Sequence, residues 1–591
     1  MARFFLYVYT YLSSMKRLLA LSLGAFLVCG QTMAQSFQTP FEKSGGGATT
    51  TYDSCIAYYR ALAVAYPQKL RWMTMGPTDA GYPLNLVLYS SDGHTDPAGW
   101  RRSGKVVILI NNGIHPGEPD GVDASMMLLR DIVQGKIHVP DNVGLAIIPL
   151  YNIGGALDRG PYSRPNQNGP VEYGFRGNAQ NLDLNRDFTK CDSRNAVSFA
   201  RIFHYVDPHV LIDTHVSDGA DYQHTMTLLA TQHDKLGGAT GHFLHDVYEP
   251  VVFGDMKAQG DPICPYVNFE DSNPDDGWDA FYDSPRYSSG YAALFQTLSF
   301  MPETHMLKPY EKRVRSTYRL LDNMISEAGH YHREIIRARA ADREAVCRQQ
   351  QFPLAWHTDS TRVDTIDFKG YTAGHKPSDV SGLPRLYYDH TRPYEKAVRY
   401  YNYFAGIDTV TKPKAYLIPQ GWYAVTDLLR LNGVILKPLA RDTAITVQVY
   451  RITHYTAAPR PFEKHHRNTD VQVSTAVQTL RFRKGDLLVP TGHTTDRYVV
   501  EMLEPTGDDS FFSWNFFDAI LQEKEGYSAY RWEDLAAEYL KTHPEAREAL
   551  EKKKQYDPKF AANGAAQLDY VYKNSPYYEP EHMRYPVYRI N

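Results

Sequence analysis

Cysteine is scarce in this chain, and its spacing argues against one kind of metal site. Only five cysteines occur among 591 residues, and none forms a Cys-x-x-Cys pair. Cysteine ligands of structural zinc usually come in such closely spaced pairs, so the cysteines are not expected to hold zinc. Four of them follow the N-terminal segment, and in an oxidising compartment they allow up to two disulfides in three connectivities, among which the sequence does not choose. These are Cys55, Cys191, Cys264 and Cys347.

An excess of positive charge is also missing. The formal net charge is -4 and the isoelectric point is near 6.6, which makes nucleic acid a poor candidate partner. No internal repeat is found. With 591 residues and 43% hydrophobic content, the chain is globular and large enough for two or more cores. The oligomeric state is not determined by the sequence.

The N-terminus has the pattern of a secretory signal peptide over residues 1–34. From Met15 the chain has Lys16-Arg17, then an apolar run over residues 18–29, then Thr32-Met33-Ala34 with small residues suited to cleavage. The apolar run is too short for a transmembrane helix. We therefore expect export to the periplasm or the extracellular space, with no membrane span in the mature chain.

Two apolar runs deliver metal-binding side chains at their ends. Residues 106–110 form an aliphatic run followed by Asn-Asn-Gly and then by His115 and Glu118. A second run, residues 210–212, leads to His215. Both patterns predict a buried strand that stops at a loop, where open α/β sheets bind their ligands. His-x-x-Glu alone is a weak motif, and a surface ion pair is the simpler interpretation, but with the distant His it makes a three-ligand zinc site with an open position.

Helical and strand patterns alternate through the first half of the chain. Helices are expected over residues 51–65 and 122–133, and strands at 70–75, 84–88, 106–110 and 143–150. This alternation predicts an α/β fold with a mixed central sheet covered by helices on both faces.

The order of the polar residues resembles the zinc metallocarboxypeptidases of the carboxypeptidase A type, over about residues 50 to 330. His-x-x-Glu is followed by Arg176, then by Asp183-x-Asn185-Arg186, then by a strand-end His. The resemblance implies one zinc per chain held by His115, Glu118 and His215. It implies that Asn185 and Arg186 bind the terminal carboxylate of the substrate, that Arg176 polarises the scissile carbonyl, and that Asp183 orients His115 by accepting a hydrogen bond.

The same resemblance calls for a carboxylate general base at the end of a later strand. The apolar run over residues 294–301 delivers Glu303, which we assign as that base. His305 stays outside the predicted ligand set. A mobile tyrosine often precedes the base in relatives, and of Tyr282, Tyr287 and Tyr291 the first lies nearest the family distance, so Tyr282 is the predicted substrate contact.

The expected domains are a signal peptide at 1–34, a zinc carboxypeptidase-like domain at 45–330, a helical connector at 331–355 and a β-rich domain of unknown role at 356–591. The predicted function is zinc-dependent hydrolysis of the C-terminal peptide bond of peptides with a free carboxylate. One alternative is a zinc amidoacylase of the aspartoacylase type, which shares His-x-x-Glu and a later His. Another is a non-catalytic protein on the same fold that binds peptides or glycans.

Overall fold

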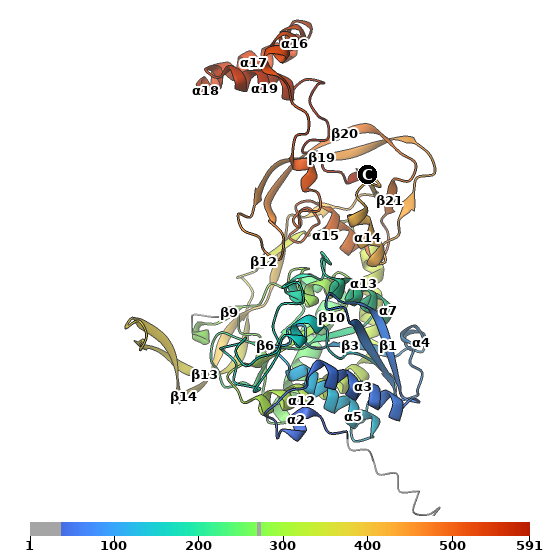
Figure 1. The fold of residues 1–591 in the computed structure, drawn as a ribbon, viewed down its shortest axis with the longest axis vertical. Coiled ribbons are helices and arrows are strands. Elements are labelled where there is room, and N and C mark those ends of the chain that lie inside the picture. Colours follow the sequence, from blue (N-terminus) through green and yellow to red (C-terminus); the bar gives the residue numbers. More distant parts are fainter. Residues whose placement is uncertain (1–36, 269–272) are drawn as a thin grey trace, which may run out of the picture.

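The computed structural model describes residues 37–268 and 273–591 (Figure 1). The predicted signal peptide lies outside the described residues. Within the described part, no helix combines the length and the apolar character needed to cross a membrane.

A nine-stranded mixed sheet forms the centre of the first half of the chain. The strand order is β1-β2-β4-β3-β5-β10-β7-β8, and β6 pairs with β10. The inner pairs β4-β3, β3-β5 and β5-β10 are parallel, whereas β1-β2, β2-β4 and β10-β7 are antiparallel. The strands are β1 Leu70–Pro77, β2 Pro83–Ser90, β3 Val106–Asn111, β4 Val143–Ile148, β5 Val210–Asp213, β6 His215–Ser217, β7 Met226–Ala230, β8 Cys264–Pro265 and β10 Leu298–His305.

Both faces of this sheet are covered, which confirms the predicted α/β class. In β3 every residue is buried; Val107 and Leu109 belong to one core cluster, and Ile108 and Ile110 to the other. Side chains alternate between the faces of a strand, so an uninterrupted aliphatic run is what a strand covered on both sides requires. The face with Ile108 is covered by α3 Tyr52–Ala65, α5 Asp120–Val133, α10 Glu249–Ala258 and α12 Tyr310–His330, and the other face by α7 Arg194–Val206.

One strand is displaced from its predicted position. Helix α11 Ser288–Ala293 ends just before the strand expected at 294–301. The first residues of that range form a turn in which Gln296 has φ of 53°, and β10 begins only at Leu298 and runs on to His305. A short apolar run without alternation does not distinguish a buried helix end from a buried strand. The remaining short helices are α2 Pro40–Lys43, α4 Pro97–Arg102, α6 Ile153–Leu157, α8 His233–Leu236 and α9 Gly238–Phe243.

Helix α13, His332–Arg348, leads into the second half of the chain. There a six-stranded sheet has the order β18-β21-β17-β22-β19-β20 and lies above the first sheet in Figure 1. Its strands are β17 Ala415–Ile418, β18 Lys437–Pro438, β19 Thr443–Ala457, β20 Asn468–Phe482, β21 Leu487–Pro490 and β22 Tyr588–Ile590. Helices α14 Tyr423–Leu431 and α15 Asp496–Leu503 lie between the two sheets (Figure 1).

Two further units project from the second half (Figure 1). One is a long hairpin of β13 Asp364–Pro377 and β14 Pro384–Tyr401, which meets the first half through β9 Trp278–Asp279. The other is a helical group with its own small core around Trp532. It consists of α16 Ala529–Thr542, α17 Pro544–Tyr556, α18 Pro558–Ala561 and α19 Gly564–Lys573. The second half is therefore β-rich with an added helical unit.

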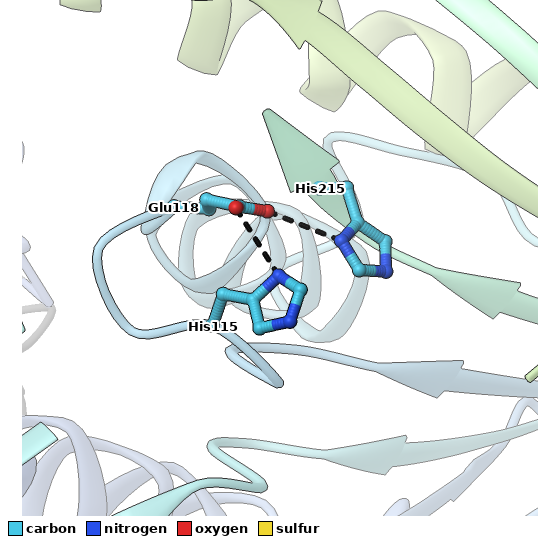
Figure 2. A group of neighbouring side chains, drawn as sticks. All are labelled: His115, Glu118 and His215. Atoms are coloured by element: carbon cyan, nitrogen blue, oxygen red, sulfur yellow. Dashed lines mark hydrogen bonds and ion pairs between the residues drawn. The ribbon is translucent and has the colours of Figure 1, made fainter. Parts of the chain in front are cut away.

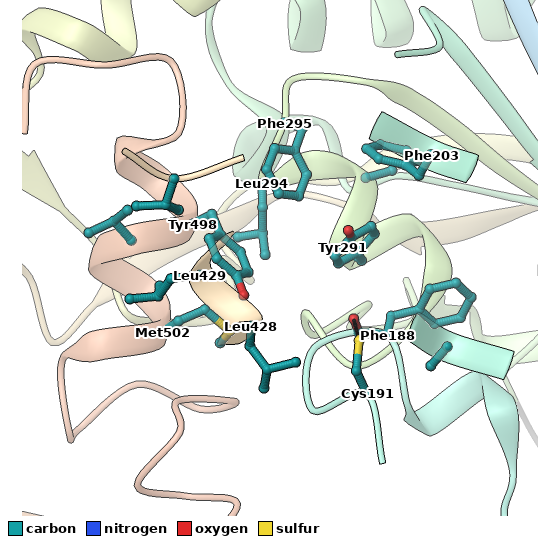
Figure 3. Packing of buried hydrophobic residues seen from close by; sticks show 14 of the residues in the cluster. Phe188, Cys191, Phe203, Tyr291, Leu294, Phe295, Leu428, Leu429, Tyr498 and Met502 are labelled. Atoms are coloured by element: carbon teal, nitrogen blue, oxygen red, sulfur yellow. Dashed lines mark hydrogen bonds between the residues drawn. The ribbon is translucent and has the colours of Figure 1, made fainter. Parts of the chain in front are cut away.

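The two halves share one apolar core (Figure 3). Phe203, Tyr291 and Phe295 from the first half pack with Tyr498 and Met502 from helix α15. The rings of Phe295 and Tyr498 are stacked with centroids 5.4 Å apart. Because this cluster is continuous, unfolding one half exposes apolar surface of the other.

The four cysteines that were candidates for disulfides are all free, and three of them are buried. Cys191 contacts the carbonyl oxygen of Phe188 at 3.5 Å (Figure 3). Burial raises the pKa of the Cys55 thiol, of Cys191 and of Cys264, so these side chains are packed as small apolar groups.

Candidate metal centre and active site

The three predicted zinc ligands meet at the carboxyl edge of the central sheet. His115 and Glu118 lie on the loop between β3 and α5, and His215 begins β6, which pairs with β10 beside β5. The carboxylate of Glu118 faces both imidazoles (Figure 2). Its Oε1 is 3.1 Å from His115 Nδ1, and its Oε2 is 3.1 Å from His215 Nδ1. The sequence therefore brings together side chains that are about a hundred residues apart, because neighbouring parallel strands end at the same edge.

Each histidine has a further carboxylate on its far nitrogen. His115 Nε2 is 2.9 Å from Asp183 Oδ1, and His215 Nε2 is 3.3 Å from Asp213 Oδ2. Asp213 is itself held by the amide of Asn111, which donates to Oδ1 at 2.9 Å. A carboxylate on one ring nitrogen fixes the tautomer, so that the other nitrogen is free to bind a metal. Both Nδ1 atoms are thereby directed towards Glu118.

The site fits a divalent cation. The three ligand atoms lie within 4.8 Å of one another, and all three side chains are buried. Two imidazole nitrogens and one carboxylate oxygen form the donor set of catalytic zinc sites, which keep a further position for water or substrate. Within the described residues this is the one group of its kind, and the residues present suit one Zn²⁺ per chain.

Charge around Glu118 favours its ionised form. Burial alone would raise its pKa, but His115, Arg164 and His215 lower it well below the ordinary value. Arg164 donates to Glu118 Oε1 at 2.6 Å, and the backbone N–H of Val216 donates to Oε2 at 3.0 Å. The carboxylate is therefore kept charged and fixed in orientation, as a metal ligand must be.

A cavity of about 470 Å³ opens beside these ligands. Glu303 lines it, and in the parallel register of β10 and β6 Glu303 is paired with His215. Burial raises the pKa of Glu303 to about 8, with His215 opposing and Glu118 adding to the rise. A bound dication lowers that pKa, since it favours the carboxylate. Burial and a bound dication therefore shift the pKa of Glu303 in opposite directions. A general base works best when its pKa lies near the working pH.

The residues predicted to bind the substrate line the same cavity. Arg176, Asn185 and Arg186 are all among its walls. Asp183 begins the short 3-10 turn Leu184–Arg186, where its side chain accepts from the N–H of Asn185. Asp183 Oδ2 also accepts from Arg176 Nε at 2.9 Å. The Asp183 carboxylate therefore contacts a metal ligand, His115, and two parts of the predicted substrate site, Arg176 and the turn that carries Asn185.

The prediction for Tyr282 differs from the structure. Its hydroxyl donates to Asp508 at 2.6 Å, and it is not among the residues that line the cavity. Tyr287 lines the cavity instead, with the Arg186 guanidinium 4.5 Å from its ring centroid. Of the three candidate tyrosines, Tyr287 is therefore the one that faces this cavity, a few residues nearer to Glu303 than predicted. His305 is buried against Asp221 at 3.1 Å and does not reach the cavity.

Two functional contacts were missed by sequence reasoning. Arg164 lies in the long polar loop before Arg176, where nothing in the local pattern distinguishes it from other loop cations. Asp213 stands two residues before His215 at the end of the strand, and the Asp-x-His order in that place was the available signal.

Comparison with known proteins agrees with this geometry. The family profile for zinc carboxypeptidases matches residues 55–205. Carboxypeptidase 2 of Trichophyton rubrum is 21% identical over 466 residues, which cover 73% of this chain and 77% of that protein. Carboxypeptidase 2 of Trichophyton tonsurans is 21% identical over 541 residues, covering 83% and 90% respectively.

Two solved structures are similar to part of the chain. The metallo-carboxypeptidase from Burkholderia cenocepacia is 16% identical with a TM-score of 0.34, covering 47% of this chain and 69% of that one. Carboxypeptidase A from Helicoverpa armigera is 13% identical with a TM-score of 0.36, covering 49% and 74%. The profile match over residues 55–205 and the distant relatives show that this chain is similar to zinc carboxypeptidases, and the His-Glu-His centre suits the zinc that the family description names.

Proposed function

We propose that the protein is a zinc-dependent metallocarboxypeptidase that releases the last residue from peptides with a free C-terminal carboxylate. The observation that carries the proposal is that one cavity is lined by the three ligand side chains, by Glu303 and by the Asn185-Arg186 pair. These are the groups needed to activate water, to bind a terminal carboxylate and to place the last peptide bond between them.

Each side chain has a distinct role in the proposed reaction. His115, Glu118 and His215 would hold the metal, which when bound would supply Lewis-acid chemistry at the scissile carbonyl and the attacking water. Glu303 accepts the proton of the attacking water and delivers it to the departing amine. Arg176 donates to the carbonyl oxygen as negative charge develops there.

The end of the peptide is recognised by charge. The planar guanidinium of Arg186 can bind a carboxylate through two parallel hydrogen bonds. Tyr287 beneath it fixes the plane of the guanidinium, and the amide of Asn185 adds a neutral donor. Recognition of the terminal carboxylate makes the enzyme an exopeptidase.

The test compares matched peptides with a free and an amidated C-terminus, on wild type and on Arg186→Ala. A hydrogen bond to a charged group contributes about 1.5 to 3 kcal/mol, so amidation should lower kcat/KM for wild type at least roughly tenfold. Arg186→Ala should lower kcat/KM for the free-acid peptide by a similar factor. The variant should then cleave the free-acid and the amidated peptide equally well. Arg194→Ala, an exposed arginine at the start of α7, is the matched control and should behave as wild type.

Equal cleavage of both peptides by the wild type would show that Arg186 is only structural. Release of an acyl group from N-acyl amino acids without cleavage of peptides would favour an amidoacylase. Binding of peptides or glycans without turnover would favour a binding protein.

We further propose that the mature protein is exported, on the basis of its N-terminal sequence, and that its catalytic domain spans 45–330. The connector at 331–355 and the domain at 356–591 would follow it. N-terminal sequencing of protein recovered from the periplasm and from the medium tests the cleavage near Ala34 and separates the two locations.

A further inference from the structure

The second half of the chain contacts the active site directly as well as through the shared apolar core. The loop between β19 and β20, residues 458–467, lies over the turn that carries Asp183. Glu463 Oε2 accepts a hydrogen bond from the backbone N–H of Asp183 at 2.8 Å, across a sequence separation of 280 residues. Two residues further along the loop, His465 Nε2 is 2.7 Å from Asp192 Oδ2.

The loop that presents Glu463 is held in an unfavourable backbone conformation. Glu463 and Lys464 both have positive φ, of 48° and 74°, a region that residues other than glycine seldom adopt. Such conformations persist where surrounding contacts determine them, and they gather at functional sites. Phe462 stacks on Trp514 with ring centroids 6.3 Å apart. This contact fixes the residue that precedes Glu463 and Lys464.

A second contact reaches the other side of the substrate-carboxylate site. Asp509 accepts from the backbone N–H of Arg286 at 2.8 Å and from its Nε at 3.1 Å. Arg286 also lies over the ring of buried Trp514, at 5.4 Å from the centroid. The next residue is Tyr287, the ring on which Arg186 rests. The second half of the chain therefore supports both the turn that bears Arg186 and the tyrosine beneath it.

A small displacement of the Asp183 backbone would move several parts of the active site at once. Its side chain contacts His115 at 2.9 Å and Arg176 at 2.9 Å, and it caps the turn that continues to Asn185. A metal ligand, the donor to the scissile carbonyl and the carboxylate-binding pair all depend on its position. An acceptor for the Asp183 N–H fixes that position from outside the first half of the chain.

The contact is not an ion pair. Burial raises the pKa of Glu463, the hydrogen bond from the Asp183 N–H lowers it, and the charge of the Asp183 carboxylate raises it again. What Glu463 supplies is a hydrogen-bond acceptor for a backbone donor, and a neutral amide oxygen can supply the same.

We propose that Glu463 is a positioning residue of the active site, through which the C-terminal half completes the site by fixing the turn that carries Asp183, Asn185 and Arg186. This rests on the proposed carboxypeptidase function for its kinetic consequence. Its consequence for zinc affinity is independent of that function, since it acts through the Asp183 contact to His115.

The test uses the full chain with three variants: Glu463→Ala, Glu463→Gln and His465→Ala. Glu463→Ala leaves the Asp183 N–H without its acceptor, and should lower kcat/KM for free-acid peptides about tenfold, mainly through KM. Its zinc affinity, measured by chelator competition, should fall by about threefold to tenfold, less than the roughly 10- to 100-fold expected when an orienting carboxylate is itself removed.

Glu463→Gln keeps the acceptor and removes the repulsion with Asp183, so both quantities should stay within about twofold of wild type. His465→Ala removes the neighbouring contact of the same loop to Asp192 and is the matched control, expected within about twofold as well. If the loop contact were only structural, Glu463→Ala and His465→Ala should have similar losses. The proposal instead expects a loss in Glu463→Ala that is absent in Glu463→Gln and in His465→Ala.

Wild-type values for Glu463→Ala in both measurements would overturn the proposal. Equal losses in Glu463→Ala and His465→Ala would also overturn it, because the loop would then act only by holding the two halves together. A wild-type protein that cleaves no peptide refutes the carboxypeptidase function, and the zinc affinities of the same variants still decide the role of Glu463.

Discussion

Replacing Asp183 with Asn tests the geometry of the site most severely, because one carboxylate serves two partners. Its Oδ1 is 2.9 Å from His115 Nε2, and its Oδ2 accepts from Arg176 at 2.9 Å. His115 and Arg176 keep the pKa of Asp183 far below its ordinary value in spite of burial, which raises it. An asparagine has one acceptor oxygen in place of two, so the amide group can satisfy His115 or Arg176 but not both.

The magnitude follows from these two contacts. Loss of the carboxylate behind a metal-binding histidine costs about 10- to 100-fold in metal affinity, which corresponds to about 1.4 to 2.7 kcal/mol. Loss of the charged hydrogen bond to Arg176 costs a further 1.5 to 3 kcal/mol or so in placing that guanidinium. We therefore expect Asp183→Asn to bind zinc at least tenfold more weakly and, even when saturated with zinc, to have kcat/KM lowered by at least tenfold.

The assay measures the zinc dissociation constant by chelator competition and kcat/KM at saturating zinc. Asp213→Asn is the matched control, since Asp213 is fully buried against His215 and has no contact with Arg176. It should weaken zinc binding but leave kcat/KM of the zinc-saturated enzyme close to wild type. Unchanged zinc affinity in Asp183→Asn, or equal kinetic loss in both variants at saturating zinc, would refute the assigned roles.

Three further outcomes are expected. His215→Ala should lose zinc and activity together, because the remaining two ligands do not form a closed binding site; full zinc content by elemental analysis would remove His215 from the ligand set. Glu303→Gln should keep its zinc and lose about 10²- to 10⁴-fold in kcat, since the amide cannot accept the proton; near-normal turnover would rule out Glu303 as the base. Tyr498→Ala should lower the free energy of unfolding by about 3 to 5 kcal/mol, as truncation of a buried aromatic does, and should lower the melting temperature of both halves in calorimetry. The control is Tyr530→Ala, at a side chain that is 84% exposed, and it should change the free energy of unfolding by less than about 0.5 kcal/mol. If the first half of Tyr498→Ala melted at the wild-type temperature, the shared core would be contradicted.

The metal centre was predictable because each part of it is encoded locally. Aliphatic runs that end at His115 and His215 are evident in the sequence, and buried parallel strands deliver the residues after them to one edge of the sheet. Glu118 is only three positions from His115, so the loop conformation alone brings them together. The order of Asp183, Asn185 and Arg186 added the substrate side by resemblance.

Other features depend on how distant segments pack, and local patterns do not encode them. Tyr282 lay at the family distance from Glu303, yet in the structure Tyr287 is the tyrosine whose ring lies against Arg186. Arg164 is one cation among several in a polar loop, and only the folded loop places it against Glu118.

The sequence by itself determined the α/β class and the group of His115, Glu118 and His215 that can hold one zinc, because strand periodicity and strand-end residues are short-range properties of the chain. Only the tertiary structure decided that Tyr287 lies against Arg186, that the C-terminal half contacts the turn that carries Asp183, and that the four cysteines in the described residues stay unpaired. The contact between Glu463 and Asp183 joins residues 280 positions apart. It is a long-range contact between the two halves of the chain, which no local periodicity specifies.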